Sequence, residues 1–239
     1  MIQISERLQH AAAMVTPGNR LADVGTDHGY VPIYLIQKGI IPNAIAMDIN
    51  AGPLERAKEH IEQYGLGGYI QTRQSDGVAA LQPQEADSIL IAGMGGGLVI
   101  HILTDGKNVC TQAKELILQP QSELERVRRF LDESGYVVDE EDMVLEEGKF
   151  YPMMRVHYEK EHAACVDELS YLYGKKLLNS QNKVLLQYLQ QEKRIYDGIR
   201  QNLVKMDDSP KIKTRLKEVE QILAWNQKAI SYFEQKLQK

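Results

Sequence analysis

Two patterns of hydrophobic and polar positions divide the chain. In residues 1–158, short apolar runs alternate with stretches in which apolar residues recur every three or four positions. The short runs are almost continuously apolar, which is typical of strands buried on both faces. This alternation predicts a parallel sheet with right-handed crossover helices. Strands are expected at 20–24, 43–48, 69–74, 87–93 and 115–119, and helices at 30–38, 52–64, 96–103 and 122–134.

A hairpin is expected at the end of this region. Segments 143–147 and 153–158 have β-strand character and flank the turn-like sequence Glu147-Gly148-Lys149. The sheet would then have seven strands, mostly parallel, with an antiparallel pair at one edge. We therefore predict an α/β domain over residues 1–160.

The pattern changes after residue 160, where apolar residues follow alternating spacings of four and three. Two heptad-patterned helices joined by a short loop predict an antiparallel coiled-coil hairpin over residues 161–239. Ser209 is expected to cap the second helix, Pro210 to begin it, and the core residue Asn226 to fix the register. At about 1.5 Å per residue the arms would be roughly 40–55 Å long. The core positions are Leu185, Leu189, Glu192, Tyr196, Ile199, Leu203 and Met206 in the first helix and Ile212, Leu216, Val219, Leu223, Asn226, Ile230, Phe233 and Leu237 in the second.

Composition narrows the class of protein. The chain has 239 residues, of which 43% are hydrophobic and 26% charged, as in a globular protein with one full domain and a smaller one. No apolar run approaches the roughly 20 residues of a membrane helix, and Glu6 and Arg7 lie where a signal peptide would be apolar. Cys110 and Cys165 form no ligand pattern, which excludes a disulfide scaffold and a zinc ribbon. We expect a cytoplasmic monomer or weak oligomer without a metal.

Charge is unevenly distributed. Residues 160–239 hold 15 Lys and Arg against 10 Asp and Glu, a net +5, whereas residues 1–159 hold 13 against 23, a net −10. An acidic body with a basic appendage indicates a polyanionic partner. A lysine-rich, solvated helical surface is the alternative explanation.

A glycine turn follows the first predicted strand. Its spacing is Gly25-x-x-x-Gly29, with Asp27 where the dinucleotide fingerprint has its middle glycine. A carboxylate aimed into the turn would repel a pyrophosphate, so nicotinamide and flavin dinucleotides are disfavoured. A cationic ligand without phosphate, such as S-adenosylmethionine, suits the loop better. The candidate cofactor-binding residues here are Gly25, Thr26, Asp27, His28 and Gly29.

Three further loops follow predicted strands and fall on the edge where open sheets bind ligands. Asp48 could accept hydrogen bonds from both ribose hydroxyls, or cap a helix. Asp76 could accept a hydrogen bond from the exocyclic amine of an adenine, or cap a helix. After the fourth strand, the glycine run 93–97 would let a substrate approach the methyl donor. Together these loops predict a methyl-donor site with the candidates Asp48, Ile49, Asp76, Gly77, Gly93, Met94 and Gly95.

The segments ADVGTDHGYVP, AMDINAGPLERA, QSDGV, ILIAGMGGG, LILQPQSELERVRRFL and KFYPMMRV closely resemble the bacterial tRNA (adenine(22)-N1)-methyltransferase family (TrmK). The resemblance covers roughly residues 5–158. It implies a Rossmann-like class I methyltransferase fold with a helical coiled-coil appendage, S-adenosylmethionine as donor and an adenosine in the D-arm of tRNA as acceptor. Gly25, Asp27, Asp48, Asp76 and residues 93–95 match the family's donor-binding motifs, and Arg7, His28, Tyr30 and Pro120 match near the donor pocket.

The chemistry assigns catalytic roles to two residues. Adenine N1 carries a lone pair and no proton, so alignment in a dry pocket matters more than a general base. Asp27 would stabilise the developing positive charge, or bind the donor only. Tyr30 would contact the target base, or belong to the core. Sequences after the fourth strand and around the cysteines lack the motifs of exocyclic-amine and cytosine-C5 methyltransferases.

RNA of this kind is recognised largely through its shape and its phosphates, so basic residues would hold it. The target base would have to be exposed or flipped to reach the site. Two other functions remain open: a non-catalytic RNA-binding or scaffold protein on a methyltransferase fold, and a small-molecule methyltransferase with a dimerisation hairpin. The candidates for a basic rim are Arg126, Arg128 and Arg129, and those along the hairpin are Lys175, Lys176, Lys183, Lys193, Arg194 and Arg200.

Overall fold

The computed structural model describes residues 1–164, 167–206 and 209–234. The chain forms two compact units, Met1–Val166 and Asp167–Lys239. The boundary expected from the sequence lies a few residues earlier, at 160. Cys165 and Leu237 lie outside the described residues.

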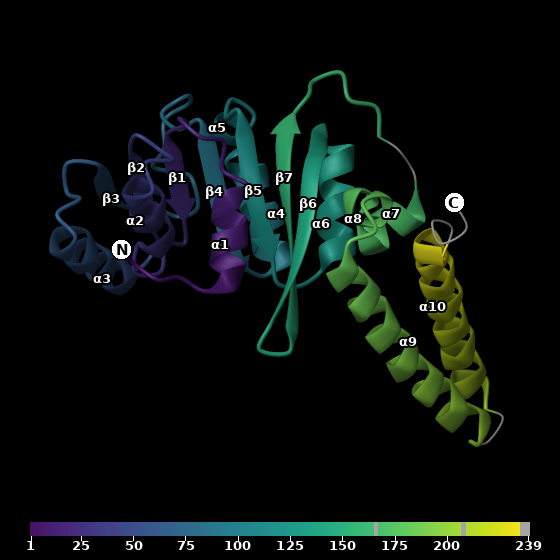
Figure 1. The fold of residues 1–239 in the computed structure, drawn as a ribbon. Helices are drawn as coiled ribbons and strands as arrows, with labels where there is room; N and C mark the ends of the chain where they lie inside the picture. Colours follow the sequence, from purple (N-terminus) through teal and green to yellow (C-terminus); the bar gives the residue numbers. More distant parts are fainter. Residues whose placement is uncertain (165–166, 207–208, 235–239) are drawn as a thin grey trace. The chain divides into compact units, whose positions relative to one another are not determined.

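The first unit contains the predicted seven-stranded sheet, in the order β3-β2-β1-β4-β5-β7-β6 (Figure 1). The five strands from β3 to β5 in this order are parallel, and β7 runs antiparallel to both β5 and β6. The α/β fold with an antiparallel edge pair is thereby confirmed. The strands are β1 (Leu21–Val24), β2 (Ala44–Asp48), β3 (Ile70–Gln74), β4 (Ser88–Met94), β5 (Glu115–Pro120), β6 (Tyr136–Glu146) and β7 (Lys149–Tyr158).

Hydrophobic cores lie on both faces of the sheet. Ile89 and Ile91 pack in one core and Leu90 in the other, because successive strand residues point to opposite faces. This explains why the central strands are almost continuously apolar in sequence. The helices of this unit are α1 (Glu6–Ala13), α2 (Tyr30–Gln37), α3 (Ala51–Gln63), α4 (Gly96–Asp105), α5 (Lys107–Cys110) and α6 (Leu124–Glu133). Of these, α1 and the short α5 were not predicted.

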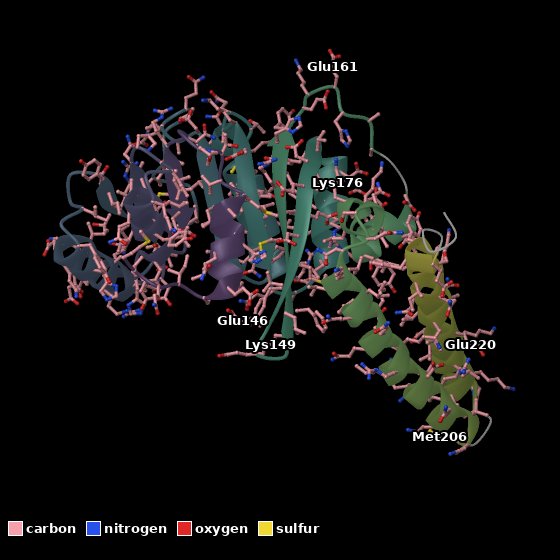
Figure 2. The ribbon with its side chains drawn as sticks, in the orientation of Figure 1. Glu146, Lys149, Glu161, Lys176, Met206 and Glu220 are labelled. Carbon is pink, nitrogen blue, oxygen red and sulfur yellow. The ribbon has the colours of Figure 1, made fainter. Side chains whose placement is uncertain are left out.

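The edge hairpin is longer than the sequence predicted. Strand β6 begins at Tyr136, in a stretch rich in acidic residues that does not resemble a strand. Glu141 in this stretch is buried and pairs with Arg128 at 2.8 Å, and Asp142 pairs with His10. Because β5 and β7 pair only up to Leu118, the turn end of the hairpin extends past the carboxyl end of β5. Figure 2 shows Glu146 and Lys149 at this turn.

The second unit is helical: α7 (Glu168–Tyr173), α8 (Lys175–Asn179), α9 (Lys183–Val204) and α10 (Pro210–Glu234). The last two form the predicted antiparallel hairpin, with Met206 at its loop end (Figure 2). The Ser209 hydroxyl accepts the Ile212 N–H at 3.3 Å, and α10 begins at Pro210, as predicted. The first arm is shorter than expected, about 33 Å at 1.5 Å per residue, because α7 and α8 take up the residues before α9. The described residues of α10 span about 38 Å.

The core of this hairpin includes a polar residue, as expected. Asn226 is fully buried, and its Nδ2 donates to the Leu189 carbonyl and to the Glu192 carboxylate, both at 2.9 Å. Glu192 also accepts from the hydroxyls of Tyr173 and Tyr188. The heptad assignment fails at its end, since Met206 is 58% exposed beyond the last turn of α9.

Candidate functional site

The loop after β1 is held in a tight, left-handed path. Gly25, His28 and Gly29 have φ values of 74°, 60° and 67°. The N–H groups of Gly25 and Thr26 both donate to the Met47 carbonyl of β2 at 2.8 Å. Glycine is favoured at position 25 by this positive φ, and a Cβ there would lie 2.1 Å from the methyl carbon of Met94, whose flexible side chain would have to move. The loops after β1 and β4 are thus in contact, as a shared site requires.

Asp23 is a site residue that the sequence analysis missed. Its side chain is buried at the end of β1, and its Oδ2 accepts a 2.6 Å hydrogen bond from the Thr26 hydroxyl. The pKa of this carboxyl group is raised to about 6, mainly by burial and also by the neighbouring charge of Asp48, against the opposing effect of the hydrogen bond from Thr26. The available signal was an acid inside a short apolar strand, two residues before Gly25. Its negative charge makes the loop attractive to a cation.

Asp27 lies elsewhere than expected. Its side chain is 74% exposed, 3.3 Å from Nε2 of His28 and 3.9 Å from Nη2 of Arg56. The carboxylate therefore lies at the surface of the loop and is not enclosed in the turn. The charge inside the turn comes from Asp23.

The acids after β2 and β3 lie at neighbouring strand ends. Asp48 accepts the Asn50 N–H at 2.7 Å through its carboxylate, and its carbonyl accepts the Ser75 N–H at 2.9 Å. Asn50, and not Asp48, occupies the N-cap position of α3, so the capping alternative for Asp48 is wrong. Next to Asp48, Ile49 exposes 52% of its surface. A cavity of about 110 Å³ beside β3 is lined by Asp76, Gly77, Val78, Ala79, His101, Ile102, Asp105 and Gly106.

The glycine run after β4 has more than one physical cause. Gly96 is needed for packing, because a Cβ there would lie 2.4 Å from the Ser122 carbonyl oxygen. At this position the glycine is therefore explained by packing and not by the approach of a substrate. Gly93 has a φ of 81° and an open face, where a Cβ would meet nothing closer than 3.8 Å. Gly95 is the N-cap residue of α4.

Three aromatic rings stack beside the β1 loop. The His28 ring centroid lies 5.1 Å from Tyr30 and 5.2 Å from His60, and Tyr30 lies 5.6 Å from His60. His60 Nδ1 is 3.0 Å from the His28 carbonyl oxygen, which supports the left-handed backbone there. His60 was missed because one histidine in an amphipathic helix gives no signal. Tyr30 is half-buried within this stack.

Beyond β4, residues from three elements meet at the end of β5. Arg7 of α1 donates from Nη1 to Oε1 of Gln119 at 2.7 Å, and its guanidinium lies 5.3 Å from the centre of the Tyr151 ring. The Gly93 N–H donates to the same Gln119 oxygen at 3.1 Å. Pro120, which follows, is buried as the last residue of β5. Arg7 was expected near the donor pocket, whereas the roles of Gln119 and Tyr151 were not anticipated.

The expected basic rim on α6 does not form as a set. Arg128 is buried against Glu141, and Arg126 and Arg129 pair with Glu123 and Glu125 at 2.7 and 3.0 Å. Within the described ranges there is no cluster of three or more His, Cys, Asp or Glu able to hold a metal ion. Among the same residues, no helix is both long and apolar enough to cross a membrane.

The assembled site fits a cationic, phosphate-free ligand. Asp23 is the second-last residue of β1, Asp48 ends β2 and Asp76 follows β3. The turn that begins at Gly25 bonds to Met47, next to Asp48, and Thr26 bonds to Asp23. On the other side of β1, the ends of β4 and β5 offer an open glycine and a buried amide, and Arg7 of α1 lies against them. One half of the sheet edge can therefore hold a donor and the other half an acceptor.

Comparisons with known proteins agree with this geometry. A family model described as tRNA (adenine(22)-N(1))-methyltransferase matches residues 21–228. A protein of that name from Bacillus subtilis is 35% identical over 222 residues, covering 91% of this chain and 93% of its own. The crystal structure of the B. subtilis m1A22 tRNA methyltransferase TrmK superposes with a TM-score of 0.85 at 32% identity, covering 96% of this chain and all of that one. A Streptococcus pneumoniae protein described as a putative tRNA (m1A22) methyltransferase, in complex with S-adenosyl-L-methionine, has a TM-score of 0.80 at 30% identity, covering 92% of this chain and all of its own.

Proposed function

Because this chain belongs to the tRNA (adenine(22)-N(1))-methyltransferase family, we propose that it methylates N1 of adenosine 22 of tRNA with S-adenosylmethionine as donor. The observation that carries this proposal is the row of acids at the carboxyl edge of β1, β2 and β3 beside the glycine loop after β4. Since the substrate is a tRNA, we place the reaction in the cytoplasm.

The donor half of the site is assigned residue by residue. Asp48 would accept the ribose hydroxyls, and Asp76, with Gly77 and Ile49, would hold the adenine. The loop from Gly25 to Gly29, together with residues 93–95, would hold the methionine part. The cradle fits such a ligand because it presents buried and exposed carboxylates and a backbone free of side chains at Gly93. When bound, S-adenosylmethionine supplies a methyl group activated by its positively charged sulfur.

The acceptor reaction needs little proton chemistry. Adenine N1 attacks with its lone pair, so the protein must align the base and exclude water. We assign Asp27 to stabilising the positive charge that develops on the base, since it is the exposed carboxylate at the loop surface. Tyr30, whose ring lies beside those of His28 and His60, would present an aromatic face to the base.

The helical hairpin would bind the body of the tRNA. Its unit carries the positive charge of the chain, and phosphate contacts dominate affinity for nucleic acids. Lys193 and Arg200 are less available than expected, because both pair with Asp197. The exposed cations that form no ion pair in the described part of this unit are Lys175, Lys183, Arg194, Lys205, Lys211, Lys217 and Lys228.

Nucleoside mass spectrometry tests the proposed function. Unmodified tRNA is incubated with the protein, with and without S-adenosylmethionine, and digested to nucleosides. We expect N1-methyladenosine only when the donor is present. Donor binding without any methylated nucleoside would favour a small-molecule methyltransferase, and tRNA binding without donor binding would favour a scaffold protein.

A further inference from the structure

One face of α9 carries basic and amide side chains and no acidic one. Glu192, one of the two acids of this helix, points to the opposite side, where Asn226 donates to it. Asp197, the other acid, flanks the face and is neutralised by Lys193 and Arg200. We call α9 face the seven exposed residues that follow helical spacings of three and four: Lys183, Gln187, Gln190, Arg194, Gly198, Gln201 and Lys205.

The three cations of the α9 face are evenly spaced. Lys183, Arg194 and Lys205 follow one another at intervals of eleven residues, which is close to three helical turns. They therefore lie nearly on one line, about 16 Å apart along the helix axis. None of the three forms an ion pair with another residue that the structure describes. A row of free cations separated by amides suits the backbone of a nucleic acid, because both kinds of side chain bond phosphate and sugar oxygens.

Gly198, within the α9 face, is not required by the fold. It lies inside a helix of 22 residues, where glycine is less favourable than alanine. Its φ is not positive, and an added Cβ would meet no atom within 4 Å. Neither the backbone conformation nor a neighbouring side chain therefore explains this glycine. A glycine on an exposed helix face lets the backbone of a partner come close, which is a second indication of a bound molecule.

The other helix of the hairpin has a different surface. The exposed residues of α10 include Glu218, Glu220 and Glu234, and Arg215 pairs with Glu218 at 2.8 Å. Acids and bases are thus mixed on α10, whereas they are separated on α9. A second copy of this chain is a poor occupant of the α9 face, because two such faces would bring like charges together. The charge of the face favours a polyanion.

We propose that the α9 face lies along the sugar–phosphate backbone of a double-stranded stem of tRNA, with Gly198 at the point of closest approach. Double-stranded RNA is recognised largely through its phosphates and 2′-hydroxyls. The three cations would bind phosphates, and the amides of Gln190 and Gln201, on either side of Gly198, would bond ribose hydroxyls. This inference rests on the proposed function and assigns the closest tRNA contact of the hairpin to α9.

A bulky residue at position 198 tests the close approach. Gly198→Leu in the full-length protein should raise the melting temperature of the helical unit, because leucine favours a helix and the position has room. It should nevertheless weaken tRNA binding about tenfold or more, since the side chain would hold the RNA backbone away. Ala224→Leu adds a bulky side chain at an exposed position of α10 and should keep the affinity for tRNA. Filter binding compares them, and unchanged affinity in Gly198→Leu, or equal losses in both, would overturn the proposal.

Two added charges test the rest of the face without a change of shape. Gln190→Glu with Gln201→Glu should weaken tRNA binding about tenfold or more, because two carboxylates would face phosphates. The matched control, Gln221→Glu with Gln227→Glu, places the same charge on exposed positions of α10. At about 0.15 M salt, charges farther than about 8 Å from the RNA are largely screened, so the control should lose several-fold less affinity. Equal losses in the two double variants would refute the assignment to α9.

The proposed function and the α9 face fail in different ways. Wild-type protein that forms no N1-methyladenosine, while the α9 variants still lose affinity for tRNA, would refute the function and retain the face. Normal methylation by the wild type, with equal tRNA affinities in all variants, would refute the face and retain the function. Light scattering tests the other occupant: a wild-type dimer that dissociates in Gly198→Leu without loss of tRNA affinity would assign the face to a second copy of this chain.

Discussion

Asp23 makes the donor loop sensitive to pH. Its pKa, about 6 in the folded chain, lies above the ordinary value of 3.8. The folded state therefore holds a proton that the unfolded chain releases, and the stabilisation it provides is lost as pH rises from about 4 to 6. Across this window Asp23→Asn should gain about 2–3 kcal/mol relative to the wild type. Urea unfolding at both ends of the window measures it, and a constant difference would contradict the pKa assignment.

Asp48 should contribute to donor affinity. A carboxylate that accepts ribose hydroxyls makes hydrogen bonds worth about 1.5–3 kcal/mol each, so Asp48→Ala should weaken donor binding tenfold or more. Asp139→Ala, on the exposed edge strand β6, removes an equal charge away from the site and serves as the control. Calorimetry with S-adenosylmethionine gives both constants. Equal affinities in the two variants would remove Asp48 from the ribose site.

Asp27 should act on turnover more than on donor binding. Asp27→Asn keeps the shape of the side chain and removes its charge, so a residue that stabilises the developing cation would lose kcat with little change in donor affinity. Single-turnover rates and donor titrations separate the two effects. Parallel losses in both would make Asp27 a donor-binding residue only.

At the scale of elements, the junction of β4 and α4 depends on Gly96. A Cβ at this position would lie 2.4 Å from the Ser122 carbonyl oxygen and 2.9 Å from the Val127 side chain, so Gly96→Ala should destabilise the fold by about 1–3 kcal/mol. At Gly97 the nearest atom is the flexible Glu123 carboxylate, at 3.1 Å, and Gly97→Ala should be nearly neutral. Thermal unfolding compares them. Equal stability of the two variants would contradict the packing argument.

Elements with a clear hydrophobic pattern could be predicted from the sequence. Elements whose buried polar side chains pair with residues elsewhere in the chain could not. The strands ending at Val24 and Asp48 were found because burial on both faces makes them apolar throughout. The first half of β6 was missed because its acids are neutralised by partners distant in sequence, such as Arg128. The same reason hid Gln119, since its role comes from Arg7, 112 residues away. Loop glycines and strand-end acids are local signals, whereas buried polar pairs are not.

At the scale of the whole molecule, charge and chemistry are carried by different units. The donor acids lie in residues 1–159, which have a net charge of −10. Residues 160–239, which include the helical unit, have a net charge of +5. Removing two unpaired cations of the hairpin, Arg194→Ala with Lys217→Ala, should lower tRNA affinity and reduce its salt dependence by up to about 2 in log–log slope. Donor affinity should not change.

Two lysines of the body provide the control for this prediction. Lys38→Ala with Lys107→Ala removes the same charge from exposed positions on the first unit. Filter binding across a series of salt concentrations compares the two double variants. Equal losses of tRNA affinity would show that net charge alone matters and that the hairpin is not the contact surface.

The central claim concerns one atom of one nucleotide, and reverse transcription reads it directly. A methyl group on N1 blocks Watson–Crick pairing, so a modified adenosine stops primer extension. After incubation of unmodified tRNA with the protein and S-adenosylmethionine, we predict a donor-dependent stop at position 22 that disappears when adenosine 22 is replaced by guanosine. No stop, or a stop at a different nucleotide, would contradict the account.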